Sequence, residues 1–312
     1  MSRSFFFGAI SVLSGPPPST DYGLYGGGYN PTPSWLASTE KYTYSTNAVT
    51  SGTSLSVAKL SLMATGNKTI GIFGAGMLSS NVRQITTDVY NYSSNAVSAG
   101  TNLITAVADG GATGNLTVGI FGGGSLTSGS SAAVDKYTYS TSVVSAGSVL
   151  AYARKLVGAV GNSTVGIFGG GIIGTSSVTN VTDKYTYSGD VSISGTNLNL
   201  AKWGSNPAGN STVGIFAGGF NASSVSIATT SKYTYSGDAA AAGTALVGAA
   251  RGRMSGTGSA TVGVFTGGNT TGSVATATSD KYTYASNTTA AGTSLGTARY
   301  SHAACSSVAN GM

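Results

Sequence analysis

The sequence predicts an all-β protein made of six copies of a four-stranded unit, a six-bladed β-propeller. Two observations lead to this prediction. An apolar strand that ends in an aromatic residue and a Gly-rich tail recurs every 47 to 49 residues, and a period of this length is typical of propeller blades. In addition, no part of the chain sustains the 3.6-residue apolar period of an amphipathic helix.

The first repeated element is the apolar strand itself. The run from Thr164 to Phe168 is mostly apolar, as expected for a strand that is covered on both faces. We interpret the Gly-rich tails that follow as tight packing near the centre, where strands converge. The aromatic residues of the six copies are Tyr25, Phe73, Phe121, Phe168, Phe216 and Phe265.

The second element is the strand Lys-Tyr-Thr-Tyr. Side chains alternate between the two faces of a strand, so both tyrosines point to one side and Lys and Thr to the other. Five copies have this sequence unchanged, and Val89 to Tyr92 is a variant in the second repeat. The five copies begin at Lys41, Lys136, Lys184, Lys232 and Lys281.

A third strand leads into a Gly that is followed three residues later by Leu, as in Gly195 and Leu198. The fourth strand is predicted to run through residues 153–160, with equivalents in the other repeats. A Gly-Asn pair such as Gly161-Asn162 separates it from the next aromatic strand. Both residue types tolerate positive φ, which predicts a tight two-residue hairpin turn.

The chain enters the repeat at the apolar strand around residues 23–28 and leaves it after a fourth-type strand around residues 302–309. We therefore expect the C-terminal strand to pair beside residues 22–28 in the first blade and to close the ring, which leaves no open strand edge. The propeller is predicted to span residues 21–312.

Residues 1–20 are predicted to form an extended N-terminal arm outside the ring. Three consecutive prolines, Pro16 to Pro18, favour an extended and semi-rigid conformation. The arm also carries three consecutive phenylalanines, which we interpret as a docking element for a neighbouring subunit. These are Phe5, Phe6 and Phe7.

A basic residue lies seven or eight positions after the third-strand Gly in every repeat except the second, where Val107 stands. Together with the Gly-rich tail and the Tyr strand, this pattern resembles the kelch repeat family, although the family's Trp near the third strand is missing. The resemblance implies a propeller, and kelch-like proteins occur among phage virion components. The basic residues are Lys59, Arg154, Lys202, Arg251 and Arg299.

The chain is poor in the residues that perform catalysis. It has one histidine, His302, and one cysteine, Cys305, whereas zinc, copper and iron sites need several such ligands. Five of the nine acidic residues occupy one repeat position, which indicates a structural role, and Asp21 and Asp109 are singular. We predict no enzyme, metal site or cofactor. The five periodic acids are Glu40, Asp88, Asp135, Asp183 and Asp280.

Two classes of partner are not expected. The net charge is +6, but the cations are spread along the chain without a basic run, so no nucleic-acid partner is predicted. The longest apolar run, from Phe5 to Leu13, is far shorter than the ~20 residues of a membrane-spanning helix. We therefore predict no membrane insertion.

The basic residues have two interpretations. The repeat places them at similar heights around the axis, where a ring of cations would hold a carboxylate, a sulfate or an acidic loop of a partner. Alternatively, each one hydrogen-bonds to loop carbonyl groups between blades. Trp35 and Trp203 are singular rather than periodic, which makes them candidates for ligand or partner binding, with packing as the alternative.

Function is predicted from these features and from the resemblance. The expected role is a non-enzymatic structural protein of a phage virion or tail that binds other protein subunits of the particle. The alternative is a lectin-like adhesin on a cell surface or outside the cell, which would attach to a receptor or a cell-surface glycan through repeated weak contacts.

Overall fold

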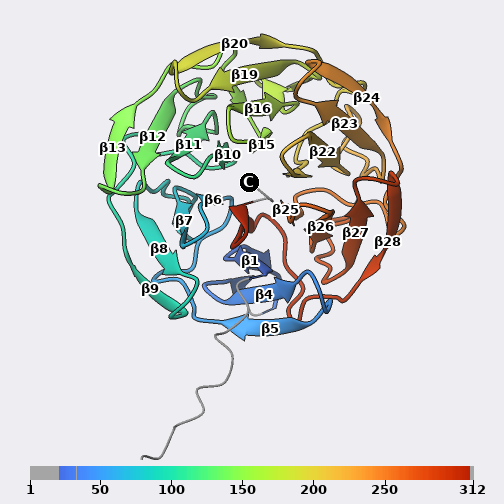
Figure 1. The fold of residues 1–312 in the computed structure, drawn as a ribbon, viewed down its shortest axis with the longest axis horizontal. Helices are drawn as coiled ribbons and strands as arrows, with labels where there is room; N and C mark the ends of the chain where they lie inside the picture. The colour runs from blue at the N-terminus through green and yellow to red at the C-terminus, as the bar shows by residue number, and fades with distance from the viewer. Residues whose placement is uncertain (1–20, 33, 310–312) are drawn as a thin grey trace, which may run out of the picture.

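A computed structural model of the chain describes residues 21–32 and 34–309. The predicted arm, with Phe5, Phe6 and Phe7, lies outside the described residues. The described chain is all-β, without an α-helix, and forms six four-stranded antiparallel sheets and two smaller ones. Figure 1 shows the four-stranded sheets arranged around a central axis. This arrangement is compatible with a β-propeller-like fold.

We number the four-stranded sheets 1 to 6 along the chain and give their strands in hydrogen-bonding order. Sheet 1 contains β29 (Ala303–Ser306), β1 (Tyr22–Gly26), β4 (Thr39–Thr43) and β5 (Val49–Gly52). Sheet 2 contains β6 (Met63–Gly66), β7 (Ile70–Gly74), β8 (Thr87–Asn91) and β9 (Ala96–Ala99). Sheet 3 contains β10 (Gly111–Gly114), β11 (Val118–Gly122), β12 (Val134–Thr138) and β13 (Val143–Ala146).

The other three sheets repeat this order. Sheet 4 contains β15 (Gly158–Gly161), β16 (Val165–Gly169), β19 (Thr182–Thr186) and β20 (Val191–Gly195). Sheet 5 contains β21 (Ala208–Gly209), β22 (Val213–Ala217), β23 (Thr230–Thr234) and β24 (Ala239–Gly243). Sheet 6 contains β25 (Ser255–Gly258), β26 (Val262–Thr266), β27 (Ser279–Thr283) and β28 (Thr288–Gly292). The smaller sheets contain β14 (Arg154–Lys155), β17 (Ile172–Ile173) and β18 (Ser177–Val178), and β2 (Tyr29–Asn30) and β3 (Ser34–Trp35).

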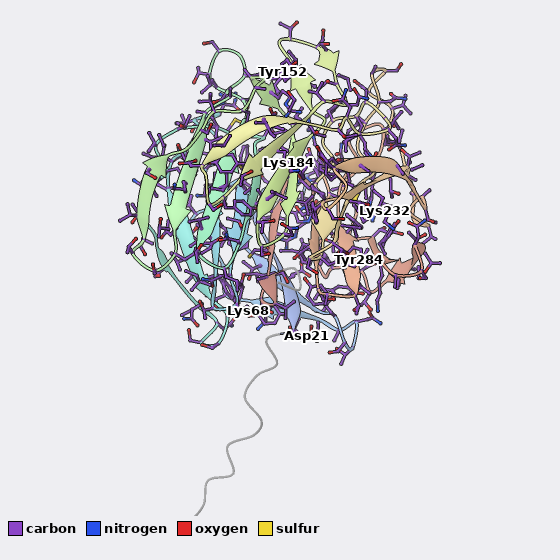
Figure 2. The ribbon with its side chains drawn as sticks, turned by 45° about the horizontal axis from the view of Figure 1, so that its top comes forward. Asp21, Lys68, Tyr152, Lys184, Lys232 and Tyr284 are labelled. Carbon is purple, nitrogen blue, oxygen red and sulfur yellow. The ribbon has the colours of Figure 1, made fainter. Side chains whose placement is uncertain are left out.

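The tyrosine strands have the alternation that the sequence predicts. In β19 and β23, Tyr185 and Tyr233 are fully buried, whereas Lys184 and Lys232 are partly exposed. Figure 2 shows these two lysines on neighbouring sheets. The buried tyrosines pack between sheets. Aromatic side chains bury a large apolar area, so these tyrosines stabilise the contacts between sheets.

The two ends of the described chain pair in one sheet, as predicted. Strand β29 is antiparallel to β1, with Gly23 opposite Ser306 and Gly26 opposite Ala303. Cys305 lies opposite Leu24 in this register, and both side chains are buried in the same cluster.

The predicted fourth strand is divided in two. Arg154 and Lys155 form the short strand β14, and the innermost strand β15 begins only at Gly158. Leu156 lies between them with φ of +56°, a left-handed conformation that turns the chain. The prediction of one continuous strand over residues 153–160 is therefore wrong.

The turn before each aromatic strand also differs from the prediction. The Asn67 side-chain oxygen accepts hydrogen bonds from the N–H groups of Thr69 and Ile70, at 2.8 and 3.0 Å. Neither Gly66 nor Asn67 has positive φ. A tight hairpin turn does join the two strands, since the Asn67 N–H donates to the Ile70 carbonyl oxygen at 3.0 Å. The expected positive φ at the Gly-Asn pair is wrong, because the asparagine side chain itself supplies the acceptor that forms the turn.

The Gly-rich tails pack against the next repeat. Gly170 and Gly171 have φ of +69° and +96°, and the Gly171 N–H donates to the Lys202 carbonyl oxygen at 2.8 Å. A Cβ at Gly170 would lie 2.6 Å from the same oxygen. The tails are absent from the residues that line the axial cavity. Their glycines thus serve contact between sheets, which replaces the interpretation of packing at the centre.

None of the described elements is a helix of the length and apolarity that crossing a membrane requires.

Candidate binding face

The five periodic basic residues are buried inside the protein. Each has at most 1% of its surface exposed, so no open ring of cations faces solvent. They are Lys59, Arg154, Lys202, Arg251 and Arg299.

Arg154 shows how the sheets use these cations. Its guanidinium donates hydrogen bonds to the carbonyl oxygens of Gly170 and Val181, at 2.9 and 2.7 Å, and forms an ion pair with Asp183. Burial lowers the pKa of Arg154, and the Asp183 carboxylate opposes that shift. These bonds match the interpretation of cations that satisfy loop carbonyl groups between sheets, and they leave no accessible surface for a soluble ligand.

The same ion pair recurs in sheets 6 and 1, but among the described residues sheet 2 has none, because Lys59 donates to the Thr86 carbonyl oxygen at 3.0 Å rather than to Asp88. Arg251 lies 2.6 Å from Asp280 and Arg299 lies 2.8 Å from Glu40. A buried carboxylate without its cation would be strongly unfavourable. The periodic acids and bases thus form a buried structural system, in which an arginine pairs with an acid in three of the six sheets.

Two sheets lack one half of the pair. In sheet 5, Ser231 replaces the acid, and Lys202 Nζ donates a hydrogen bond to the Phe216 carbonyl oxygen at 2.7 Å. Burial lowers the pKa of Lys202 to about 7. In sheet 3, where Val107 replaces the cation, Asp135 instead accepts hydrogen bonds from the N–H groups of residues 104 and 105, at 3.0 and 2.9 Å.

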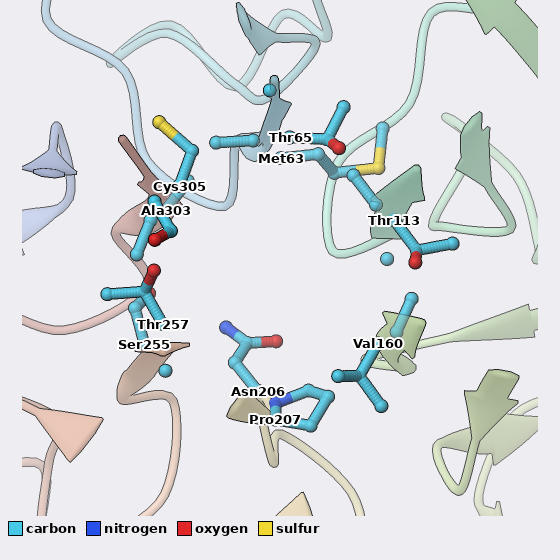
Figure 3. Close-up of a pocket in the computed structure, with 18 of the residues that line it drawn as sticks. Met63, Thr65, Thr113, Val160, Asn206, Pro207, Ser255, Thr257, Ala303 and Cys305 are labelled. Carbon is cyan, nitrogen blue, oxygen red and sulfur yellow. The ribbon is translucent and has the colours of Figure 1, made fainter. Parts of the chain in front are cut away.

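A cavity of about 60 Å³ lies on the axis and is lined by the innermost strands. Figure 3 shows its wall of small and uncharged side chains, among them Thr65, Thr113, Val160 and Asn206. A cavity of this size holds a few water molecules and is too small for a sugar or a peptide.

Six residues form a cycle of backbone hydrogen bonds at one end of this cavity. Each has positive φ, and each N–H donates to the carbonyl oxygen of the preceding member, at 2.6 to 3.0 Å; the first member donates to the last. We call them the mouth residues. They are Ser61, Asp109, Leu156, Gly204, Arg253 and Ser301.

The mouth residues line a shallow pocket that continues into the axial cavity, because Leu62, Gly110 and Asn206 belong to both. Among the described residues that line this pocket, two have charged side chains, Asp109 and Arg253. They are three steps apart in the cycle of six, so their backbone positions lie on opposite sides of the mouth. The Asp109 carboxylate accepts a hydrogen bond from the Ser125 hydroxyl at 3.2 Å, and the Arg253 guanidinium lies over the Trp203 ring. No ion pair joins them among the described residues.

The two tryptophans lie on this face in aromatic clusters. Trp35 packs edge-on against Tyr29, with ring centres 6.2 Å apart, and Tyr29 contacts Tyr300 at 5.3 Å. Trp203 stacks on Phe220 at 4.4 Å. The clusters occupy equivalent places, since Tyr29 bridges to Tyr300 as Phe220 bridges to Trp203.

Arg253 lies between these two clusters. Its guanidinium carbon is 5.4 Å from the Trp203 ring centre. Its charge also acts on Tyr300, where it opposes the rise in pKa that burial causes. We call the set the aromatic arc. It consists of Trp35, Tyr29, Tyr300, Arg253, Trp203 and Phe220.

The sheet between the two clusters has small side chains on this face. Gly252 and Asn269 occupy the bridging positions that Trp203 and Phe220 hold in sheet 5. A Cβ at Gly252 would lie 2.3 Å from the Phe220 ring. Glycine at this position therefore lets the Phe220 ring lie over the chain and stack on Trp203.

The single histidine and cysteine are both interior residues. His302 is 1% exposed, and its Nε2 lies 3.1 Å from the Thr266 hydroxyl. Burial, together with the charge of Arg299, lowers the pKa of His302. Burial raises the pKa of the Cys305 thiol to about 12. Within residues 21–32 and 34–309, no three His, Cys, Asp or Glu side chains are grouped as a metal site would require.

The sequence identified Trp35, Trp203 and Asp109 separately but missed Arg253. The equivalent position in the other five repeats holds Ser, Asp, Leu, Gly and Ser. An arginine at this position is therefore unique to one repeat, and the sequence alone could have shown this. Tyr152, another singular aromatic, is 44% exposed in a loop (Figure 2) and takes no part in the arc.

Comparison with known protein families finds no match to the chain, and comparison with curated proteins finds none either.

Proposed function

We propose that residues 21–312 form a closed six-bladed β-propeller of the kelch-like kind. Three features support closure. Strands β29 and β1 pair, the mouth cycle returns from Ser301 to Ser61, and Lys281 of sheet 6 donates to the Asn47 side chain of sheet 1 at 3.1 Å. Closure removes the exposed strand edges that otherwise recruit other chains.

We further propose that the protein is a non-enzymatic interaction protein. One observation carries this proposal: the five periodic basic residues are buried in bonds between sheets, whereas four singular residues, Trp35, Asp109, Trp203 and Arg253, lie on one face. Recognition sites favour aromatic and arginine side chains. A rigid ring with one distinctive face is suited to holding a partner rather than to transforming a substrate.

The role that we assign is that of a phage virion or tail component that docks on a neighbouring subunit. The kelch-like resemblance supports it, together with the apolar residues Phe5, Phe6 and Phe7 of the N-terminal segment. The test is co-sedimentation of the full chain, and of a chain without residues 1–20, with candidate particles. We expect the full chain to join the particle and the shortened, folded chain to stay free. Equal association of both chains would refute docking through the arm.

Glycan or receptor binding at a cell surface is the second candidate, and the aromatic arc favours it. Sugar rings pack their C–H faces on aromatic side chains, whose polar edges remain available to hydroxyl groups. A glycan array probed with the full chain tests this function. Binding to the array without particle association would favour an adhesin over a virion component.

A further inference from the structure

Sheet 5 keeps the donors of the buried ion pair but not its acid. Ser231 occupies the place that Asp183 has in sheet 4, since Ser231 lies opposite Phe216 in the strand register as Asp183 lies opposite Phe168. The Ser231 side chain is shorter than aspartate and fully buried, and its hydroxyl has no hydrogen-bond partner among the described residues. A buried polar group without a partner requires an explanation, and a bound ion is one.

The Lys202 ammonium lies where the acid-binding nitrogen of an arginine lies in sheet 4. Arg154 Nη2 donates both to the Phe168 carbonyl oxygen, at 3.3 Å, and to the Asp183 carboxylate. Lys202 Nζ donates to the equivalent carbonyl oxygen, that of Phe216, at 2.7 Å, and to one further carbonyl oxygen at 3.4 Å. An ammonium has three N–H donors. One donor therefore remains for an acceptor at the place of the carboxylate.

Backbone N–H groups complete the set of donors. In sheet 4 the Ala151 N–H donates to the Asp183 carboxylate at 2.9 Å, and in sheet 6 two successive N–H groups donate to the acid at 3.1 and 2.8 Å. The loop at sheet 5 begins in the same way, because the Leu198 N–H donates to a carbonyl oxygen at 2.8 Å, as its counterpart at sheet 4 does at 2.9 Å. The next two N–H groups, those of Asn199 and Leu200, have no acceptor among the described residues.

We propose that these donors bind a small monovalent anion such as chloride, at the place that a carboxylate has in the other sheets. The anion accepts from the Lys202 ammonium, the Ser231 hydroxyl and the N–H groups of residues 199 and 200. Hydrogen bonds to an ion are stronger than those between neutral groups, and the anion supplies the counter-charge that a buried ammonium needs.

Burial and sequence restrict this site. Lys202 and Ser231 are at most 1% exposed, so the site admits only an ion without bulky substituents. The side chains of Asn199 and Leu200 are exposed, which places the site directly beneath the surface. In the other five sheets an acidic side chain occupies the equivalent position. The anion site is therefore specific to the joint between sheets 4 and 5.

The test is urea unfolding of the full chain in sodium chloride and in sodium gluconate at equal concentration. Gluconate is the monovalent anion that is too bulky for the site. The measurement is made at pH 6, below the Lys202 pKa of about 7, so that the amine is protonated. An anion that binds only the folded chain stabilises it. We expect the equilibrium constant of unfolding to be at least tenfold lower in chloride than in gluconate.

Three variants assign the effect to the site. Ser231→Asp places a carboxylate where the anion binds, and Lys202→Met removes the ammonium, so both should lose the difference between chloride and gluconate. Lys68→Gln removes an exposed cation far from the site in sequence and should keep the full difference. General effects of salt on the protein surface are common to all four chains. If Lys202→Met fails to fold, Ser231→Asp alone decides.

Crystals of the full chain in sodium bromide locate the ion, because bromide substitutes for chloride and scatters anomalously. We expect an anomalous peak beside Lys202 Nζ and the Ser231 hydroxyl. A chain that unfolds equally in chloride and gluconate would overturn the inference. So would a chloride effect that Ser231→Asp retains in full, or bromide crystals without a peak at this position.

Discussion

Replacing Lys202 with methionine removes a buried amine whose pKa burial lowers from 10.5 to about 7. In the unfolded chain this lysine keeps its proton up to the ordinary lysine pKa. Between pH 7 and 10.5 the unfolded chain thus binds one proton more than the folded chain at this position. The free energy of unfolding therefore rises with pH across this window, and below pH 7 the contribution no longer changes.

The size of the effect follows from the shift. Each pH unit inside this window changes the free energy of unfolding by about 1.4 kcal/mol. The titration of Lys202 therefore raises the free energy of unfolding by about 3 kcal/mol between pH 7 and 9.5. The assay is reversible urea unfolding of the unsubstituted chain and of Lys202→Met at several pH values. Tyrosines and other lysines titrate in both chains, so the difference between the two curves isolates Lys202.

The expected difference between the two chains grows by about 3 kcal/mol from pH 7 to 9.5. A difference that stays constant over this range would refute the argument, because Lys202 would then have an ordinary pKa. Ser231→Asp is the matched variant, since it places a carboxylate where Asp183 stands in sheet 4. It should raise the Lys202 pKa, flatten the pH dependence and stabilise the chain at pH 7 by about 1.5–3 kcal/mol.

Two further predictions concern the joints between sheets and the aromatic arc. Asp183→Asn leaves a buried arginine without its counter-ion and should lower the free energy of unfolding by about 3–5 kcal/mol. Asp135 accepts only from N–H and hydroxyl donors, so Asp135→Asn should lower the free energy of unfolding by about 1 kcal/mol. Equal losses for the two variants in urea unfolding would contradict the role of the ion pair. Gly252→Ala should push the Phe220 ring off the neighbouring tryptophan and change its fluorescence, while Gly189→Ala, whose Cβ would have its nearest neighbour at 3.6 Å, should leave the spectrum unchanged. An unaltered spectrum for both would argue against the stack.

The periodic part of the structure was predictable because each repeat contains its own strand pattern. The alternation of Lys-Tyr-Thr-Tyr follows from strand geometry alone, and the pairing of residues 303–306 with β1 follows from the strand that the first repeat lacks. The turns were predicted less well. Side-chain acceptors such as Asn67 and a left-handed residue such as Leu156 decide them locally, and the strand pattern does not contain that information.

The binding face was predicted only in fragments, because it depends on contacts between residues that are far apart in the chain. Tyr29 and Tyr300 come from opposite ends and meet only when the ends pair. The sequence marked Trp203 as singular, but its contacts with Arg253 and Phe220 arise from the arrangement of neighbouring sheets. For the same reason the sequence left two interpretations of the basic residues open, a solvent-facing ring or hydrogen bonds to loop carbonyl groups, and only the fold shows them buried between sheets.

The proposed closure of the ring depends on the pairing of β29 with β1, and the single cysteine allows a direct test of it. Leu24 and Cys305 are register partners in β1 and β29, at a separation that a disulfide can bridge. The measurement is mild oxidation of folded Leu24→Cys, followed by intact-mass analysis and a non-reducing gel. Leu198→Cys, which places the second cysteine in a distant part of the fold, is the control.

We expect Leu24→Cys to give a monomer that lacks two hydrogens and migrates faster than its reduced form, and Leu198→Cys to give a monomer that keeps both thiols. Free thiols or only disulfide-linked dimers in folded Leu24→Cys would contradict closure.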